Sequence, residues 1–160
     1  MTETHHANGP AGRPGRVAVI TGASRGLGRA LARAMAADGY RLVVDARDGA
    51  ALREAMAGLP AGAVVTALAG DITDPAHRGD LRRAADALGG ADLLINNAGT
   101  LGPSPLPAIS EFPLDELRTA LEVNVLAPIA LTQMLLPALR ERGGAVLNIT
   151  SDAAVEAYAG

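Results

Sequence analysis

Three glycines stand in a short run whose spacing suits the binding of phosphate groups. The run is Thr21-Gly22-Ala23-Ser24-Arg25-Gly26-Leu27-Gly28, with the pattern G-x-x-x-G-x-G. It follows an apolar stretch, 17–20, and precedes a helix-like stretch, 29–37. Glycine has no Cβ, so the backbone can turn sharply there and approach a ligand closely. A helix that begins at such a turn points free N–H groups at the phosphates. The strand–turn–helix order therefore predicts a dinucleotide site.

The turn differs from the commonest phosphate-binding turns. Its spacing is not G-x-G-x-x-G, and it lacks the Gly-Lys-Ser/Thr ending of a P-loop, which argues against nucleoside triphosphate hydrolysis. The chain contains no cysteine, which excludes disulfides and thiolate metal sites. The histidines His5, His6 and His77 are interpreted as having no chemical role, and we predict no metal site.

Composition excludes one class of partner. The length of 160 residues fits one domain with a substantial core. The aromatic side chains are only Phe112, Tyr40 and Tyr158, too few to stack the bases of a nucleic acid. The net charge of −3 offers no attraction to a phosphate backbone.

The chain carries no evident targeting or membrane segment. Residues 1–15 are rich in glycine, proline and polar groups and are predicted to form a disordered tail. They lack the apolar core of a secretory signal. The longest apolar run, 125–139, is interrupted by Pro128 and Pro137 and is too broken for a membrane span. We therefore expect a soluble, cytoplasmic protein.

Short apolar runs alternate with helix-like patterns along the chain. We predict strands near 16–21, 41–46, 63–69, 92–96 and 145–150, and helices near 26–38, 49–58, 76–88 and 114–140. Val, Ile and Leu occupy both faces of these strands, which indicates a sheet covered on both sides. Repeated strand–helix units predict a parallel, doubly wound α/β sheet with right-handed crossovers.

Particular residues mark the ends of these helices. We expect Gly39 to end the first helix and the pair 89–90 to end the third, because glycine readily adopts the left-handed conformation found there. Asp74 suits the residue before a helix, and Pro75 suits its first position.

The long helical region 114–140 is predicted to contain two segments, broken near Asn124 or kinked at Pro128. The proline-rich stretch 100–113 is predicted to be a loop over the carboxyl ends of the strands. Ligands of open α/β sheets bind on that side.

Further motifs follow the predicted strands in a characteristic order. They are Asp71-Ile72 after the third strand, Asn96-Asn97-Ala98-Gly99 after the fourth, Asn124 in the long helical region and Asn148-Ile149-Thr150-Ser151 after the fifth. Together with the glycine turn, these motifs resemble the short-chain dehydrogenase/reductase family from residue 16 to 151. The resemblance implies an NAD(P)-binding, Rossmann-like domain over 16–160, with about five strands in the order 3-2-1-4-5.

The resemblance assigns the glycine turn to the phosphates of the cofactor. It implies that the three glycines surround the pyrophosphate, that Ser24 and Arg25 lie beside the adenosine phosphate groups, and that Leu27 belongs to the same site. A second interpretation is that these are turn glycines without a ligand.

The resemblance assigns the later motifs to the nucleoside. It implies that Asp71 and Ile72 bracket the adenine ring, with Asp71 accepting from the exocyclic amine, and that Asn97, Ala98 and Gly99 line the ribose. Asp71 could instead cap the turn that follows it, and Asn97 could bond only to the backbone.

Two residues correspond to the family's catalytic tetrad. The resemblance implies that Ser151 hydrogen-bonds the substrate oxygen and that Asn124 holds a water in a proton relay, beside a tyrosine acid/base and a lysine that lowers its pKa. Ser151 could instead begin a helix, and Asn124 could relieve a helix kink. The implied substrate is a small carbonyl compound or secondary alcohol.

The end of the second strand bears on the choice of nicotinamide cofactor. If Asp45 is the terminal residue, its carboxylate suits the ribose hydroxyl of NAD. By resemblance, however, the discriminating position is the neutral Ala46, and Arg47 then faces the 2′-phosphate of NADP. Arg25 adds a second guanidinium, a group that matches a phosphate in shape and charge. We expect NADP, with NAD the less favoured alternative.

The sequence departs from the family in one respect. The catalytic Tyr-x-x-x-Lys segment is absent: Tyr158 comes too soon after Ser151, and the chain contains no lysine. We therefore expect a C-terminally truncated domain that is inactive alone. In the full-length form, the family implies a homo-oligomer in which 114–139 packs against a second subunit. The apolar face of this region fits either the core or such an interface, and we expect most of it to lie in the core. The strand near 145–150 should form an edge of the sheet.

Two other classes of protein remain open. The chain could be a non-catalytic dinucleotide-binding module that keeps only the cofactor half of the fold. It could also be a Rossmann-like methyltransferase, although the Asn96–Gly99 motif and Ser151 argue against that class.

Overall fold

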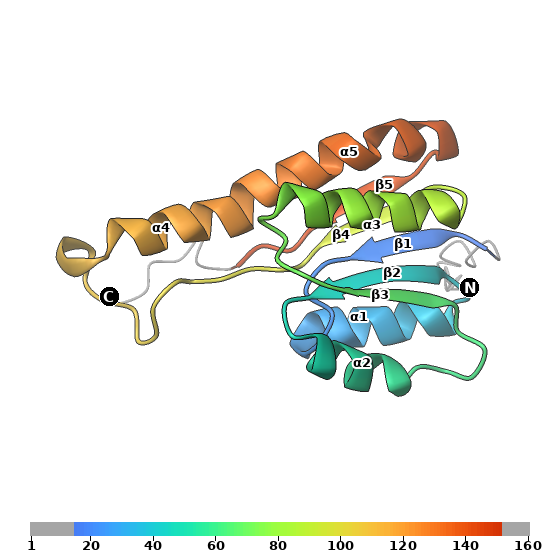
Figure 1. Ribbon diagram of the computed structural model, residues 1–160, viewed down its shortest axis with the longest axis horizontal. Helices are drawn as coiled ribbons and strands as arrows, with labels where there is room; N and C mark the ends of the chain where they lie inside the picture. Colours follow the sequence, from blue (N-terminus) through green and yellow to red (C-terminus); the bar gives the residue numbers. More distant parts are fainter. Residues whose placement is uncertain (1–14, 152–160) are drawn as a thin grey trace, which may run out of the picture.

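Five parallel strands form the centre of the protein in the computed structural model, which describes residues 15–151 (Figure 1). They are β1 (Val17–Ile20), β2 (Arg41–Ala46), β3 (Val65–Ala69), β4 (Leu93–Asn96) and β5 (Ala145–Asn148). Their order in the sheet is β3-β2-β1-β4-β5, and every neighbouring pair is parallel. The predicted strand order is confirmed, although β3 and β5 are shorter than the sequence indicated.

Helices cover both faces of this sheet, as a doubly wound fold requires. They are α1 (Gly26–Ala37), α2 (Gly49–Ala57), α3 (Pro75–Ala87), α4 (Leu114–Leu121) and α5 (Ala127–Arg142), with a short η1 (Ile109–Glu111) and a π-helical turn, η2 (Glu122–Leu126). Figure 1 shows α1 and α2 on one face and α3 and α5 on the other. The Rossmann-like architecture is therefore confirmed.

Each inner strand divides its side chains between two cores. In β1, Val17 and Val19 face a cluster with Leu81 of α3 and Leu131 of α5. The intervening residues of β1 face a second cluster formed with α1 and α2. Because successive side chains of a strand point to opposite faces, a strand buried on both faces is apolar throughout.

Local signals predicted from the sequence set the helix ends. The carboxylate of Asp74 accepts a hydrogen bond from the N–H of Ala76, with Pro75 at the first helical position of α3. Gly39, which follows α1, has a φ of +81°. Both predictions are confirmed, because each depends only on a few neighbouring residues.

The long helical region is interrupted where the sequence indicated. Asn124 lies in η2, between α4 and α5, and Pro128 lies in the first turn of α5, where a missing N–H costs no helical bond. We had expected Pro128 and Pro137 to interrupt this region, but α5 continues through both. The stretch Leu114–Arg142 has 29 residues and contains an 18-residue window with a mean hydropathy of 1.4, so its length and composition would suit a membrane span.

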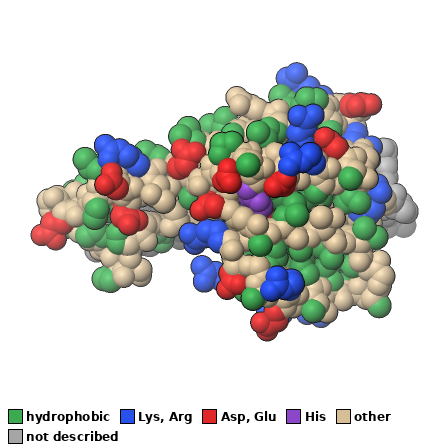
Figure 2. Space-filling model, viewed as in Figure 1, with side chains coloured by type: hydrophobic (Ala, Val, Ile, Leu, Met, Phe, Trp, Pro, Cys, Tyr) green, Lys and Arg blue, Asp and Glu red, His purple; other side chains and the backbone are tan. Residues whose placement is uncertain are grey.

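That similarity is weak evidence that the chain crosses a membrane, because core helices of soluble proteins can have the same length and hydropathy. Leu131, Leu135 and Leu139 of α5 are buried against the sheet. The exposed apolar residues lie mainly on α4, η2 and the preceding loop, and Figure 2 shows them mixed with acidic and basic side chains at the projecting end of the molecule.

The strand β5 is an edge of the described sheet, as predicted. It pairs only with β4 among the described strands, and its Val146 and Leu147 are exposed. Unpaired backbone groups on such an edge can pair with another chain.

A buried carboxylate ties several elements together at the amino end of the sheet. Asp92, directly before β4, accepts hydrogen bonds from the N–H of Val17 at 2.8 Å and from two guanidinium nitrogens of Arg142 at 3.0 and 3.1 Å. Its burial disfavours the charged form, but the bonds from Arg142 and Val17 outweigh this effect and lower the pKa of Asp92. The end of α5 is thereby joined to β1 and β4.

Asp92→Ala should lower the free energy of unfolding by about 1–3 kcal/mol, because it leaves the buried N–H of Val17 without an acceptor. Since the native pKa of Asp92 is lowered, its contribution is present above the unfolded pKa of about 3.9 and is lost as the pH falls through the native value. Denaturant unfolding between pH 7 and pH 3 measures both effects. Asp86→Ala, in an exposed ion pair, should change little; equal losses would contradict the assignment.

Candidate functional site

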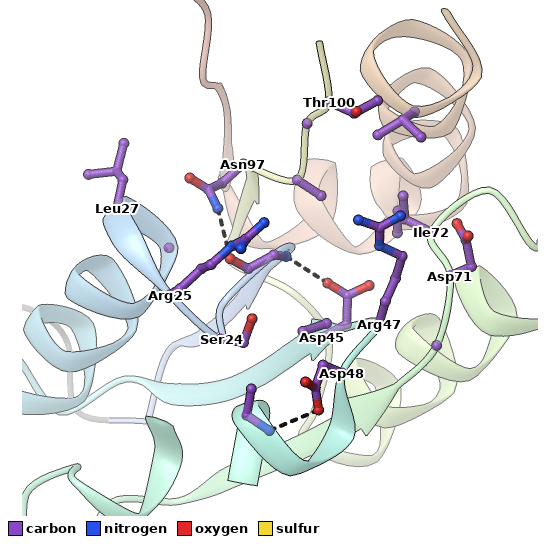
Figure 3. Close-up of a pocket in the computed structure, with 18 residues that line it drawn as sticks. Ser24, Arg25, Leu27, Asp45, Arg47, Asp48, Asp71, Ile72, Asn97 and Thr100 are labelled. Atoms are coloured by element: carbon purple, nitrogen blue, oxygen red, sulfur yellow. Dashed lines mark hydrogen bonds between the residues drawn. The ribbon is translucent and has the colours of Figure 1, made fainter. Parts of the chain in front are cut away.

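A cleft of about 490 Å³ lies at the carboxyl ends of β1, β2 and β4 (Figure 3). Its walls contain most of the residues that the sequence assigned to a cofactor. The lining residues are Gly22, Ser24, Arg25, Leu27, Gly28, Asp45, Ala46, Arg47, Asp48, Ala51, Gly70, Asp71, Ile72, Asn97, Ala98, Gly99, Thr100 and Val123. Gly26 belongs to the same turn without lining the cleft. The fold therefore brings the glycine turn, the end of β2 and the motifs that follow β3 and β4 to one place.

The glycines of the turn are needed for different reasons. Gly22 and Gly26 have φ values of +69° and +53°, a region that residues with a Cβ rarely adopt. Gly28 has ordinary helical geometry, but a Cβ there would lie 2.4 Å from the carbonyl oxygen of Gly22 and 2.4 Å from Nδ2 of Asn97. The turn thus packs against its own backbone.

The ends of β1 and β4 hold the turn from the other side. Nδ2 of Asn97 donates to the carbonyl oxygens of Thr21 and Gly22 at 2.8 and 3.1 Å. Oγ1 of Thr21 accepts from the N–H groups of Asn97 and Ala98, both at 3.0 Å. Asn97 therefore does bond to backbone, as one interpretation expected. Thr21 was not singled out from the sequence, although a hydroxyl residue at the end of a buried strand is a signal of this kind.

Asp45 is buried beneath the turn rather than exposed to the cleft's solvent. Its side chain is 2% exposed, and Oδ1 accepts from the N–H of Gly22 at 2.8 Å (Figure 3). Oδ2 lies 3.0 Å from Nε2 of His77. Both carboxylate oxygens therefore have protein partners, and β2 ends at Ala46, with Arg47 directly after it.

His77 has a buried partner that the sequence did not indicate. It lies in the first turn of α3, is 6% exposed and is paired with Asp45. The hydrogen bond to Asp45 raises the pKa of His77, although burial opposes the change. Gly70 makes room for the ring, because a Cβ there would lie 2.2 Å from Nδ1. This pair could not be predicted from the sequence, because the two residues stand 32 positions apart.

Two guanidinium groups reach into the cleft. Figure 3 shows Arg25, at the start of α1, and Arg47, after β2, extending toward it from different sides. Both residues are exposed. A ligand with phosphate groups would meet positive charge at this end of the cleft.

Asp71 and Ile72 form the wall that follows β3. Oδ1 of Asp71 accepts from the N–H and the hydroxyl of Thr73 at 2.9 and 2.8 Å, so this carboxylate does cap the following turn. The bond from the Thr73 backbone lowers the pKa of Asp71. Ile72 is 7% exposed, and its carbonyl oxygen accepts from Arg78.

A second hollow, of about 910 Å³, adjoins the first along residues 97–100. Asn124 and Ser151 both line it, so the fold brings the two expected catalytic residues to the same hollow. The carboxamide of Asn124 accepts from the N–H of Thr100 at 2.9 Å and donates to its carbonyl oxygen at 2.7 Å. The π-helical turn is thereby fixed to the segment after β4.

Asn96, the first residue of the Asn96–Gly99 motif, bonds to a neighbouring strand rather than lining the first cleft. Nδ2 of Asn96 donates to Oδ1 of Asn148 at 2.8 Å, which ties β4 to β5 beside the second hollow. In residues 15–151, no group of three or more His, Cys, Asp or Glu side chains could hold a metal ion. Tyr158 and the tail at 1–14 lie outside the described residues.

A family model described as short chain dehydrogenase matches residues 16–160. The chain belongs to the short-chain dehydrogenase family. The resemblance noted from the sequence is thereby confirmed, and the chain is of an oxidoreductase type.

Known short-chain dehydrogenases match over most of this chain. The 1-deoxy-11-beta-hydroxypentalenate dehydrogenase of Streptomyces exfoliatus is 43% identical over 130 residues, which cover 80% of this chain and 47% of that protein. Serine 3-dehydrogenase of Rhizobium radiobacter is 35% identical, over 89% of this chain and 56% of that protein. The chain spans about half the length of such curated relatives.

Solved short-chain dehydrogenases share the fold. L-sorbose reductase from Gluconobacter frateurii, complexed with NADPH and L-sorbose, has a TM-score of 0.83 and 36% identity, covering 91% of this chain and 56% of that one. A 7α-hydroxysteroid dehydrogenase complexed with NADH has a TM-score of 0.81 and 33% identity, covering 91% of this chain and 56% of that one. Both NADPH and NADH thus occur among similar dehydrogenases.

Gly28→Ala should lower the free energy of unfolding by about 1–3 kcal/mol, as overpacking does, because the new Cβ meets backbone that cannot move aside. Gly58→Ala is the matched control: Gly58 has a φ of −88°, and its nearest neighbour would lie 3.7 Å away. That substitution should be neutral or stabilise by up to about 1 kcal/mol. Denaturant unfolding of both variants measures the difference, and similar effects would contradict the close packing assigned to Gly28.

Proposed function

We propose that this chain binds NADP(H) in the cleft beside the glycine turn, as the cofactor-binding part of an oxidoreductase. The reaction is hydride transfer between the nicotinamide ring and a small carbonyl compound or secondary alcohol. The observation that carries the proposal is the turn itself: the positive φ of Gly22 and Gly26 turns the chain at the start of α1, and Gly22 and Gly28 line the cleft.

The residues at this turn fit a pyrophosphate. Helices α2 and α3 are capped by the side chains of Asp48 and Asp74, which accept from the first N–H groups. The residue before α1, Arg25, supplies no such acceptor. The positive end of α1 and its first N–H groups therefore remain suited to an anion. The bound pyrophosphate would take the place that the carboxylates of Asp48 and Asp74 have at the starts of α2 and α3.

The charges around the adenosine end favour NADP over NAD in this proposal. A carboxylate that bonds the ribose hydroxyls of NAD needs an available oxygen. Both oxygens of Asp45 already have partners, and the next residue, Ala46, is neutral. Arg25 and Arg47 supply the positive groups that a 2′-phosphate needs.

The remaining cofactor residues are proposed by the same argument. Asp71 and Ile72 bracket the adenine ring from the end of β3, and Asn97, Ala98 and Gly99 lie against the ribose from the end of β4. All five line the cleft. The described bonds to the turn at Thr73 involve only Oδ1 of Asp71, so Oδ2 can accept from the adenine amine and the two roles of this carboxylate are compatible.

The second hollow is proposed to receive the substrate. Ser151 is the proposed hydrogen-bond donor to the substrate oxygen, and Asn124 is the proposed support of a proton relay. The bound cofactor would supply or accept the hydride. The 160 residues contain no lysine to lower the pKa of a tyrosine acid/base, so we expect negligible turnover by these residues alone.

Arg47→Asp should reverse the cofactor preference, because it replaces the proposed partner of the 2′-phosphate with a group that repels it. We expect at least tenfold weaker NADPH binding, since a hydrogen bond to a charged group contributes about 1.5–3 kcal/mol. Titration of dinucleotide fluorescence at physiological salt gives both affinities. Arg33→Asp, on the exposed side of α1, is the matched control. Tighter NADH than NADPH binding by the unaltered chain would overturn the preference.

A turnover assay separates an oxidoreductase from a non-catalytic dinucleotide-binding module. The purified 160-residue chain should bind NADPH without oxidising it in the presence of carbonyl substrates. The same assay on a chain that supplies a Tyr-x-x-x-Lys segment should show oxidation, which Ser151→Ala should abolish. Clear oxidation by the 160-residue chain would contradict the expected inactivity. Binding of S-adenosylmethionine but not NADPH would instead support a methyltransferase.

A further inference from the structure

One buried pair of titratable side chains has no part in the function proposed above. Asp45 of β2 and His77 of α3 are 2% and 6% exposed, and 3.0 Å separates their bonded atoms. The second oxygen of Asp45 accepts from the N–H of Gly22. A continuous line of hydrogen bonds therefore joins α3, β2 and the glycine turn.

The surrounding chain is shaped to keep this pair in place. Gly70, at the end of β3, leaves space that any Cβ would remove, since it would come within 2.2–2.5 Å of three atoms of the His77 ring. Moreover, the pair lies directly under the cleft, because Asp45 and Gly70 both belong to its lining. The imidazole is thus held at one position relative to the glycine turn.

A buried carboxylate at this point is unfavourable for an anionic ligand. The pyrophosphate of a dinucleotide carries negative charge and would lie next to the turn that Asp45 holds. Coulomb repulsion is strong where water is excluded, so an unpaired Asp45 would oppose binding. A proton on His77 would neutralise the pair without breaking either hydrogen bond, because the imidazolium donates through Nε2.

The charges that face His77 favour this protonated form. Besides Asp45 from β2, they are Asp74 and Asp80 from α3 and its cap and Asp71 from the segment after β3. Cations also belong to the same region: Arg47 acts on Asp71, and Arg78, the residue after His77 in α3, is buried and donates to the carbonyl oxygen of Ile72. The hydrogen bond to Asp45 and these carboxylates together raise the pKa of His77.

We infer that His77 is a positioning residue for dinucleotide binding: acting through Asp45, it holds the Gly22 turn and carries the proton that offsets the buried carboxylate when the anionic ligand enters. The proton comes from solvent, and no covalent bond changes. This inference rests on the proposed function, because it requires that the cleft bind a dinucleotide.

The sign of the effect follows from linkage. The pKa of His77 is raised in the folded protein, so the pair stabilises the fold fully below the unfolded value of about 6.5 and loses that effect as the pH rises through the folded value. An anionic ligand beside the pair favours the proton further. Dinucleotide affinity should therefore be highest at low pH and should fall across the same window.

The test compares NADPH affinity at pH 6.0 and pH 8.5 for the unaltered chain and His77→Gln. Glutamine keeps an N–H donor near the position of Nε2 but does not titrate. Because the ligand is the same in both titrations, protonation of its own 2′-phosphate cancels in the ratio. We expect the loss of affinity over this range to be about five- to tenfold larger for the unaltered chain, at the lower end of typical coupling between sites.

A second variant removes the other member of the pair. Asp45→Asn keeps an acceptor for the N–H of Gly22 and removes the charge that His77 offsets. Asp45→Asn should therefore abolish the part of the pH dependence of NADPH affinity that His77→Gln also abolishes. Combining the two substitutions should have no further effect on that pH dependence. Additive effects of the two changes would overturn the inference.

Measurements without ligand provide a readout independent of binding. The difference in melting temperature between the unaltered chain and His77→Gln should shrink as the pH rises above 6.5. His77→Leu, which leaves Asp45 with a single partner, should bind NADPH about tenfold more weakly at either pH. If the leucine variant shows no cooperative unfolding, the His77→Gln comparison decides alone.

The possible failures are distinguishable. If the unaltered chain binds NADPH but His77→Gln shows the same pH dependence, the role of His77 is overturned and the proposed function stands. If the unaltered chain binds neither NADPH nor NADH, the proposed function fails and the inference fails with it.

Discussion

The junction between the ends of β1 and β4 is the constraint on which the rest of the site depends. Across two neighbouring strands, the hydroxyl of Thr21 accepts from the backbone N–H groups of Asn97 and Ala98, and the side chain of Asn97 donates to the backbone carbonyl of Thr21. Buried backbone groups that lose their partners are costly, so these two side chains fix where each strand can end. The glycine turn, the cleft and the second hollow all begin at this junction.

Close packing around the junction explains why small residues gather there. The space that a Cβ would need at Gly28 is occupied by the carbonyl of Gly22 and the side-chain amide of Asn97. The corresponding space at Gly22 is occupied by the backbone of Ala98. The two hollows therefore share a wall with little side-chain volume. A dinucleotide that lies along such a wall would contact backbone from both strands, which suits a long ligand better than a compact one.

Features that depend on neighbouring residues were predictable from the sequence. The cap at Asp74, the left-handed residue Gly39 and the strand order all follow from short patterns and from the rules for parallel sheets. The pattern of the glycine turn predicted where the cleft lies, because the residues of the turn are adjacent in the chain. For these elements, local preference and tertiary structure agree.

Features that depend on distant partners were not predictable. Asp45 and His77 meet only after β2 and α3 have packed, and nothing near either residue indicates the other. The same holds for Asp92, whose partners stand 75 and 50 positions away. In the predicted helical region 114–140, the interruption near Asn124 was predictable, but the tolerance of Pro128 was not, since it depends on α5 beginning one residue before it.

The bonds of Asp92 at the amino end of the sheet have a consequence for local opening. β1 and β4 are held at that end by Asp92 and at the other by Thr21 and Asn97. Of the outer strands, β5 has one side-chain bond to β4, between Asn148 and Asn96, and the described contacts include no side-chain hydrogen bond from β3. Amide hydrogens exchange through openings whose free energy reflects such restraints. The sheet should therefore open from its two outer strands inward, and the central pair that carries the cleft should be the last part to exchange.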